Sequence, residues 1–68
     1  MSIGANIRRI REKKGISQVE LAHKVNVTQS MLCQIERGTK SLTLPLGMEI
    51  AAALGCDVNE LAKSEISI

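Results

Sequence analysis

Residues 17–38, SQVELAHKVNVTQSMLCQIERG, contain two short helical patterns joined by a turn, and this stretch decides the fold of the chain. Ser17 and Glu20 form a capping box, in which a hydroxyl and a carboxylate each satisfy a free backbone amide at the start of a helix. Apolar residues then recur at helical spacing, namely Leu21, Ala22 and Val25. Asn26 tolerates the left-handed backbone conformation almost as glycine does, so we expect the first helix to end near it.

The second helical pattern begins after Thr28, which can cap it, and runs from Gln29 to about Glu36, before Gly38. One apolar stripe along it should face the core, namely Met31, Leu32 and Ile35. The opposite side is polar and almost uncharged, and it consists of Gln29, Ser30, Cys33, Gln34 and Arg37. An ordinary exposed helix face would carry Lys and Glu. A glutamine amide offers a donor and an acceptor that match the N6 and N7 edge of adenine, so this face can read bases in a major groove. The plainer interpretation is a solvated polar face.

The same reasoning extends outward to three further helices. One is expected over residues 2–14, before the stop at Gly15. Another is capped by Thr43 and ended by Gly55, and a fifth follows a second capping-box sequence that starts at Asp57. Their inward residues should be Ile3, Ile7, Ile10, Ile50, Ala51, Leu54, Val58 and Leu61. No stretch long enough for a sheet alternates with period two, so the predicted fold class is all-α.

The composition favours one small globular domain. The chain has 68 residues, of which 44% are hydrophobic and 24% are charged, so a single core can form. The chain contains no Phe, Trp or Tyr, which means that the core must be aliphatic. Binding of single-stranded nucleic acid relies on aromatic stacking and is therefore disfavoured. We expect residues 1–68 to form one domain.

Several classes of protein are excluded by what the sequence lacks. No apolar run approaches the roughly 20 residues of a membrane span, and no leader sequence follows Met1, so we expect a cytoplasmic protein that is not bound to a membrane. Cys33, Cys56 and His23 are too few for a zinc site or a disulfide framework, and neither a metal nor a cofactor is expected. The sequence contains no catalytic triad, pair of inward carboxylates or Gly-rich phosphate loop. We therefore expect neither an enzyme nor a small-molecule ligand.

The charge is distributed unevenly, although the net charge is only +2. Basic residues concentrate in residues 1–15, and acidic residues outnumber basic ones in residues 41–68. This distribution suggests that a polyanion approaches the N-terminal part while the acidic part faces away. The alternative is merely a solvated basic helix.

Arg11 and Glu36 are expected to form an ion pair at the edge of the core. Arg11 lies one helical turn after Ile7, and Glu36 lies beside Leu32 rather than on the outer face of its helix. Such a pair would fix the angle between the first and the third helix, although buried pairs often contribute little net stability. The alternative is two independent surface charges.

The ordered spacing of these motifs resembles that of the phage repressor and Cro-type helix-turn-helix family. The segments that carry the likeness are residues 17–22 (SQVELA), 27–30 (VTQS), 34–38 (QIERG) and 50–55 (IAAALG), together with Arg11, Gly15, Glu60 and Leu61. The resemblance covers about residues 3–62, with the helix-turn-helix unit at about residues 17–37. It implies a compact five-helix bundle of the lambda-repressor-like type, which binds double-stranded DNA as a two-fold dimer with its third helix in the major groove.

The resemblance also implies roles for particular residues. The base readers would be Gln29, Ser30, Cys33 and Gln34. The phosphate-binding residues would be Gln18, Thr28, Arg37 and Lys40. Arg11 and Glu36 resemble the structural ion pair of the family. Asn26 replaces the usual turn glycine, and Gly47 stands where the family has a large apolar residue. Cys33 is an unusual base reader that would fill space near a thymine methyl or a sugar, with oxidant sensing as the alternative.

The sequence thus predicts a sequence-specific transcriptional regulator, similar to small phage-type repressors and to the controller proteins of restriction-modification systems. One recognition helix covers only a few base pairs, so we expect a homodimer on a palindromic or pseudopalindromic operator. The expected contact surface is the fifth helix and the tail, with Leu61, Ile66 and Ile68. One alternative is a monomer that dimerises only on DNA. Another is an antitoxin-like protein-interaction module that also binds its own operator.

Overall fold

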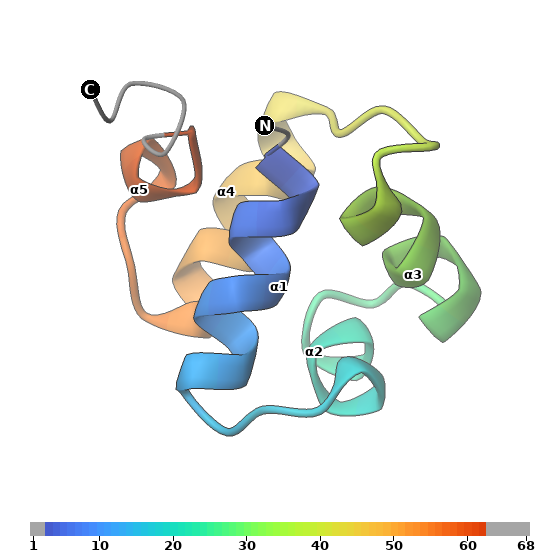
Figure 1. The fold of residues 1–68 in the computed structure, drawn as a ribbon, viewed down its shortest axis with the longest axis horizontal. Coiled ribbons are helices and arrows are strands. Elements are labelled where there is room, and N and C mark those ends of the chain that lie inside the picture. Colours follow the sequence, from blue (N-terminus) through green and yellow to red (C-terminus); the bar gives the residue numbers. More distant parts are fainter. Residues whose placement is uncertain (1–2, 63–68) are drawn as a thin grey trace.

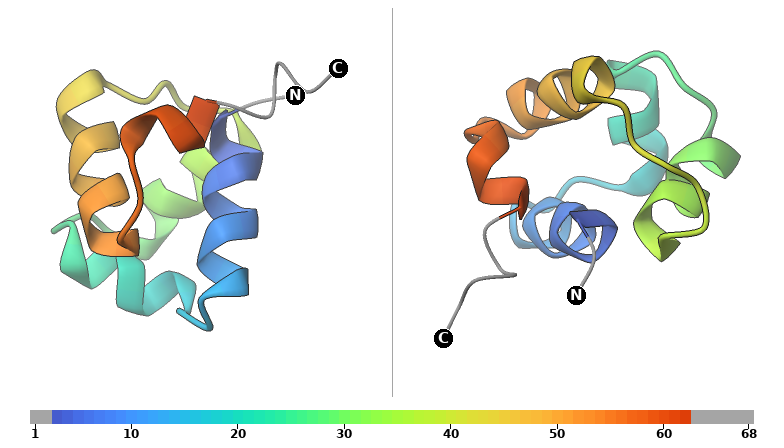
Figure 2. Two further views of the ribbon diagram at one scale, coloured as in Figure 1. Left: turned by 90° about the vertical axis from the view of Figure 1, so that its left-hand side faces the viewer. Right: turned by 90° about the horizontal axis from the view of Figure 1, so that it is seen from above.

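The computed structural model describes residues 3–62, which form five α-helices and contain no β-strand (Figure 1). The helices are α1 (Ile3–Lys13), α2 (Gln18–Lys24), α3 (Gln29–Arg37), α4 (Leu44–Leu54) and α5 (Val58–Ala62). α1 and α4 lie in the middle of the bundle, with α5 on one side and α2 and α3 on the other (Figures 1 and 2). None of these described helices has the length and apolar character needed to cross a membrane. The predicted all-α class is confirmed.

Side-chain caps start the helices where the sequence predicts them. Ser17, Thr28 and Thr43 each accept a hydrogen bond from the backbone N–H three residues later, at 3.0, 3.1 and 3.3 Å. Asp57 caps α5 through the N–H of Asn59, two residues later, at 3.0 Å. The cap of α5 therefore binds the N–H of the second residue after it, whereas a capping box uses the N–H of the third.

Residues with a positive φ mark the helix ends. Gly38 and Gly55 follow α3 and α4 with φ angles of 84° and 74°, in the left-handed region that favours glycine. Asn26 has a φ of 59°, as expected for a residue that replaces a turn glycine. α2 itself ends at Lys24, slightly before the predicted position near Asn26.

The core is aliphatic, and all five helices contribute to it. Its buried side chains are Ile7, Leu21, Ala22, Val25, Leu32, Ile35, Ile50, Ala51, Leu54 and Leu61. Leu61 was expected at a dimer contact, but it is 0% exposed. A side chain that is fully covered by its own chain has no surface for a second copy, so that expectation is wrong. Ile66 and Ile68, the other two residues of the expected contact, lie outside the described residues.

α1 packs closely against α3 and α5 through two small residues that the sequence analysis did not single out. A Cβ atom built at Gly4 would overlap the backbone carbonyl oxygen of Ile35 in α3. Asn6 is only 2% exposed, and its Nδ2 donates a hydrogen bond to the backbone carbonyl of Leu61. Its Oδ1 accepts a hydrogen bond from Arg9 Nη2 at 3.0 Å. Gly4 thus lets α1 approach α3, the helix expected to read DNA, and Asn6 ties α1 to α5.

Candidate nucleic-acid interface

α3 presents its polar side to solvent because its apolar stripe is buried in the core. Leu32 and Ile35 are 0% and 1% exposed, and Met31 is half-buried against them. The expected base readers lie on the other side of the helix. Those that the structure leaves exposed are Gln29, Ser30 and Gln34. Cys33 is half-buried, so it offers less surface to a ligand than the other three.

The residues expected to contact phosphates lie around α3, but they are not equally free. The exposed ones are Thr28, Arg37 and Lys40. Gln18 is half-buried, and its amide is engaged within the protein. Its Nε2 donates to Glu36 Oε1 at 3.1 Å, and its Oε1 accepts from Gln29 Nε2 at 3.3 Å. A phosphate contact by Gln18 would therefore have to use the second hydrogen of its amide nitrogen.

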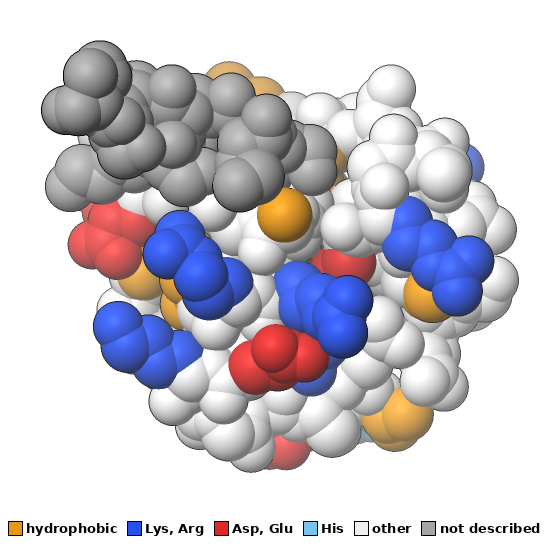
Figure 3. All heavy atoms as spheres, in the orientation of Figure 1, with side chains coloured by type: hydrophobic (Ala, Val, Ile, Leu, Met, Phe, Trp, Pro, Cys, Tyr) orange, Lys and Arg blue, Asp and Glu red, His pale blue; other side chains and the backbone are white. Residues whose placement is uncertain are grey.

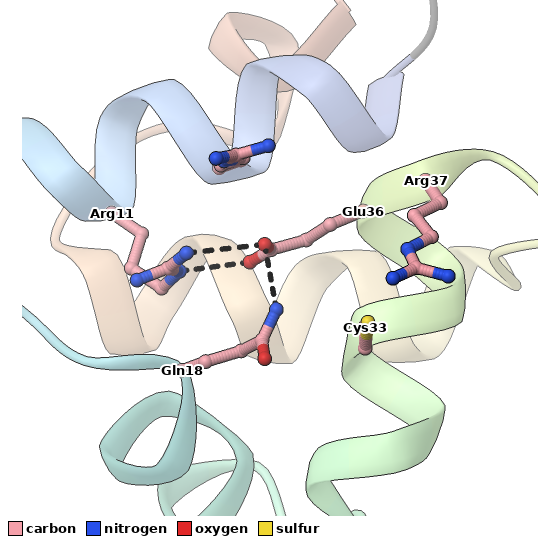
Figure 4. A pocket seen from close by; sticks show the side chains of 6 residues that line it. Arg11, Gln18, Cys33, Glu36 and Arg37 are labelled. Carbon is pink, nitrogen blue, oxygen red and sulfur yellow. Dashed lines mark hydrogen bonds and ion pairs between the residues drawn. The ribbon is translucent and has the colours of Figure 1, made fainter.

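The predicted ion pair between Arg11 and Glu36 forms, and it joins α1 to α3 (Figure 4). Arg11 Nε lies 2.8 Å from Glu36 Oε2, and Arg11 Nη2 lies 3.2 Å from Glu36 Oε1. The two side chains are 10% and 3% exposed. Arg11 Nη1 also donates to the backbone carbonyl of Ile16 at 2.9 Å. The hydrogen bond to Glu36 raises the pKa of the Arg11 guanidinium, whereas burial acts in the opposite direction.

An open pocket of about 370 Å³ lies beside this pair, between α1, the start of α2, and α3 (Figure 4). Its lining consists of Arg8, Arg11, Gln18, Cys33, Glu36 and Arg37. Arg8 is exposed and pairs with Glu12 at 3.2 Å along the surface of α1. Arg8 belongs to the basic residues 1–15 that were expected to approach a polyanion, but nothing in its spacing predicts that it lies next to α3. The described residues contain no group of three His, Cys, Asp or Glu side chains that could hold a metal ion.

The surface around this pocket is basic. Lys and Arg side chains spread across the face shown in Figure 3, over α1 and beside α3. Arg8 and Arg9 of α1 are exposed on the surface, as is Arg37 at the end of α3. A surface with several cations attracts a polyanion such as the DNA backbone. The uncharged polar face of α3 thus lies between exposed cations at its C-terminal end and on α1.

Comparison with known proteins gives one family match. The helix-turn-helix family model matches residues 7–61. The immunity repressor protein of Bacillus phage phi105 is 35% identical over 68 residues. That alignment covers 100% of this chain and 47% of the repressor, so this chain spans about half the length of that relative.

Several solved structures are also similar, and the names of two of them mention DNA. One is the DNA-binding domain of the P22 C2 repressor, with a TM-score of 0.89 and 28% identity over 98% of this chain and 88% of that domain. The other is SinR, a master regulator for biofilm formation, in its complex with DNA. Its TM-score is 0.82, and it is 34% identical over 88% of this chain and 97% of that chain.

Proposed function

This chain belongs to the helix-turn-helix family, and on that premise we propose that it is a sequence-specific transcriptional regulator that binds double-stranded DNA. The relatives named above are two repressors and a master regulator. The observation that carries the proposal is the outward face of α3, where the exposed uncharged amides of Gln29 and Gln34 lie opposite the buried Leu32 and Ile35. In this proposal α3 enters the major groove, which is wide enough for a helix.

The individual side chains then divide into two groups. Gln29, Ser30 and Gln34 read base edges, and Cys33 makes an apolar contact beside them. Thr28, Arg37 and Lys40 hold phosphates on either side of α3, and Gln18 assists with its second amide hydrogen. Their exposure and their position around α3 support this division. Phosphate contacts position the protein, and base contacts specify the sequence.

We also propose that two copies bind a palindromic or pseudopalindromic operator. A single domain of this size makes too few contacts to select one site among the competing sites of a genome. Leu44 and Met48 are 68% and 54% exposed, and they stand four residues apart on one face of α4. A second copy covering this apolar face would remove it from water. We therefore place the contact between the two copies on α4 instead of at Leu61.

Selection of bound sites from a random pool of duplexes tests these proposals together. The expected result is enrichment of two symmetrical half-sites, with centres about one turn of DNA apart, or about 10 base pairs. Absence of enrichment would overturn the proposal of sequence-specific binding. Enrichment of one unsymmetrical half-site would leave that proposal intact and would overturn the dimer.

A further inference from the structure

The loop of residues 38–43, which crosses from the end of α3 to the start of α4, is held at both ends (Figure 1). Thr39 fixes the first end, because its backbone N–H and its hydroxyl both donate to the carbonyl oxygen of Gln34, at 3.0 and 3.2 Å. Thr43 fixes the other end, where its hydroxyl caps the first turn of α4. Lys40 lies between these two ends, and its side chain is exposed.

Leu42 anchors the middle of this loop at a place where α4 has no side chain. It is half-buried and packs against the core, whereas its neighbours Ser41 and Thr43 are exposed. A Cβ atom built at Gly47 would lie 3.4 Å from Leu42 Cδ2 and 3.8 Å from Leu42 Cγ. The missing side chain of Gly47 thus leaves space on α4, and the side chain of Leu42 lies against it. The resemblance implies a large apolar residue at position 47, so this contact belongs to a position where the chain departs from its family.

We propose that Leu42 is a positioning residue, which anchors the loop against Gly47 and so presents Lys40 to a DNA phosphate. This inference rests on the proposed function, in which Lys40 holds a phosphate. A loop that becomes ordered only on binding loses conformational entropy at that step, and the loss weakens binding. The packing of Leu42 orders the loop in the free protein, so less entropy is lost when DNA binds. The gain in affinity applies to every sequence, because a phosphate contact carries no sequence information.

The substitution Leu42→Ala tests this role through its dependence on Lys40. It removes the side chain that packs on Gly47 and keeps the hydrogen bonds of Thr39 and Thr43. Its affinity for the selected operator and for random duplexes should fall alike, by about three- to tenfold, the usual effect of ordering one side chain on binding. In a Lys40→Ala background, the same substitution should change the affinity by less than about twofold, because the phosphate contact that it positions is already absent.

Leu46→Ala is the matched control, because Leu46 is also half-buried against the core but lies within α4. Both substitutions remove the same apolar atoms, so both should lower the melting temperature. Binding is measured well below the two melting temperatures, and there Leu46→Ala should bind duplexes as the parent does. If Leu42→Ala also bound as the parent does, the positioning role would be overturned. An equal loss of affinity with and without Lys40 would overturn it as well.

The order of the loop can also be measured without DNA, by NMR relaxation of the backbone amides in the free protein. Leu42→Ala should lower the order parameters of Lys40 and Ser41 toward the flexible range below about 0.6, and Leu46→Ala should leave them at the parent values. Unchanged order parameters in Leu42→Ala would overturn the anchoring of the loop. If the parent bound no duplex while the loop loosened as expected, the proposed function would fail and the anchoring would stand.

Discussion

Glu36 carries a negative charge that is almost fully removed from water, and its environment compensates for that cost. Both of its oxygens accept hydrogen bonds, two from Arg11 and one from Gln18. A buried carboxylate without such partners is strongly unfavourable. The pair therefore matters less for net stability than for holding α1 and α3 in one arrangement.

Replacing Arg11 by Ala should destabilise the protein much more than replacing Arg8 by Ala. Arg11→Ala leaves the buried carboxylate uncompensated, which costs about 3–5 kcal/mol. This loss lowers the melting temperature of a small domain by more than about 10 °C. Arg8 belongs to an exposed pair with Glu12, whose side chains are 65% and 56% exposed. Such surface pairs contribute about 0.3–0.5 kcal/mol. Equal thermal melting curves for the two variants would contradict a stabilising role of the buried contact.

Replacing a base-reading residue should weaken binding only to the selected operator, whereas replacing a phosphate-binding residue should weaken binding to every DNA sequence. Gln29→Ala or Gln34→Ala should cost about 1–3 kcal/mol on the selected operator and little on random duplexes. Lys40→Ala should weaken binding to both duplexes by a similar factor and reduce the salt dependence. Titrations of each variant with the two duplexes at several salt concentrations measure these effects. The assignment of the recognition face would be wrong if both Gln variants bound every duplex as the parent does.

Single residues were predictable from the sequence only where helical geometry alone places them. The angle of Glu36 around α3 sets it beside Leu32, and that was enough to predict its pairing with Arg11. The bonds that Gln18 makes depend on how α2 and α3 meet in space, and no spacing along the chain shows this. The same holds for Asn6, whose partner Leu61 is distant in sequence.

The helices themselves are encoded locally, which is why their positions follow from the sequence. Ser17, Thr28 and Thr43 supply caps within three residues of the amides that they bind. Gly38 and Gly55 supply the left-handed ends. How closely two helices approach is different, because it depends on residues of both elements. Gly4 looks like an ordinary helical residue in the sequence, and only the position of α3 explains why it has no side chain.

The two helical glycines should respond in opposite ways to substitution by Ala. At Gly4 the added methyl group overlaps a backbone carbonyl of α3, so Gly4→Ala should force the helices apart and destabilise the protein by about 1–3 kcal/mol. At Gly47 the added Cβ would lie 3.4 Å from Leu42 Cδ2, which is ordinary contact. Gly47→Ala should then stabilise by about 0.5–1 kcal/mol, because Ala is the better helix former. Urea unfolding of both variants measures these changes.

Each of the two glycine substitutions has an outcome that would contradict its predicted change in stability. A Gly4→Ala variant as stable as the parent would show that α1 and α3 can separate at no cost. A destabilised Gly47→Ala variant would show that the space beside Leu42 is already filled. The second result would also explain why this chain has a glycine at a position where the family resemblance implies a large apolar residue.

At the scale of the whole molecule, the polar and basic surface of α3 and α1 differs from the apolar surface of α4. The polar residues of α3 are exposed on the side away from the core, and basic side chains spread over α1 and beside α3 (Figure 3). Of the large hydrophobic side chains that are exposed in the described residues, two lie on α4 and one, Val19, lies on α2. Burying a large apolar side chain that is otherwise exposed is favourable by about 1.5–3 kcal/mol. The pair on α4 therefore favours self-association more than the single residue on α2 does.

Self-association of the protein would serve DNA binding, because a two-fold operator requires two recognition helices about 34–36 Å apart. Met48 is 54% exposed on the apolar face of α4, and Val19 is 57% exposed on α2. Met48→Lys should shift the protein toward monomer in sedimentation at micromolar concentration, because it places a charge in the contact between copies. Val19→Lys, with the same charge and similar exposure, should sediment as the parent does.

If the parent stays monomeric at every concentration but selects a symmetrical site, the two copies meet only on DNA. Met48→Lys should then weaken cooperative binding instead. Equal behaviour of both variants in sedimentation and in cooperative binding would place the contact between copies elsewhere than on α4.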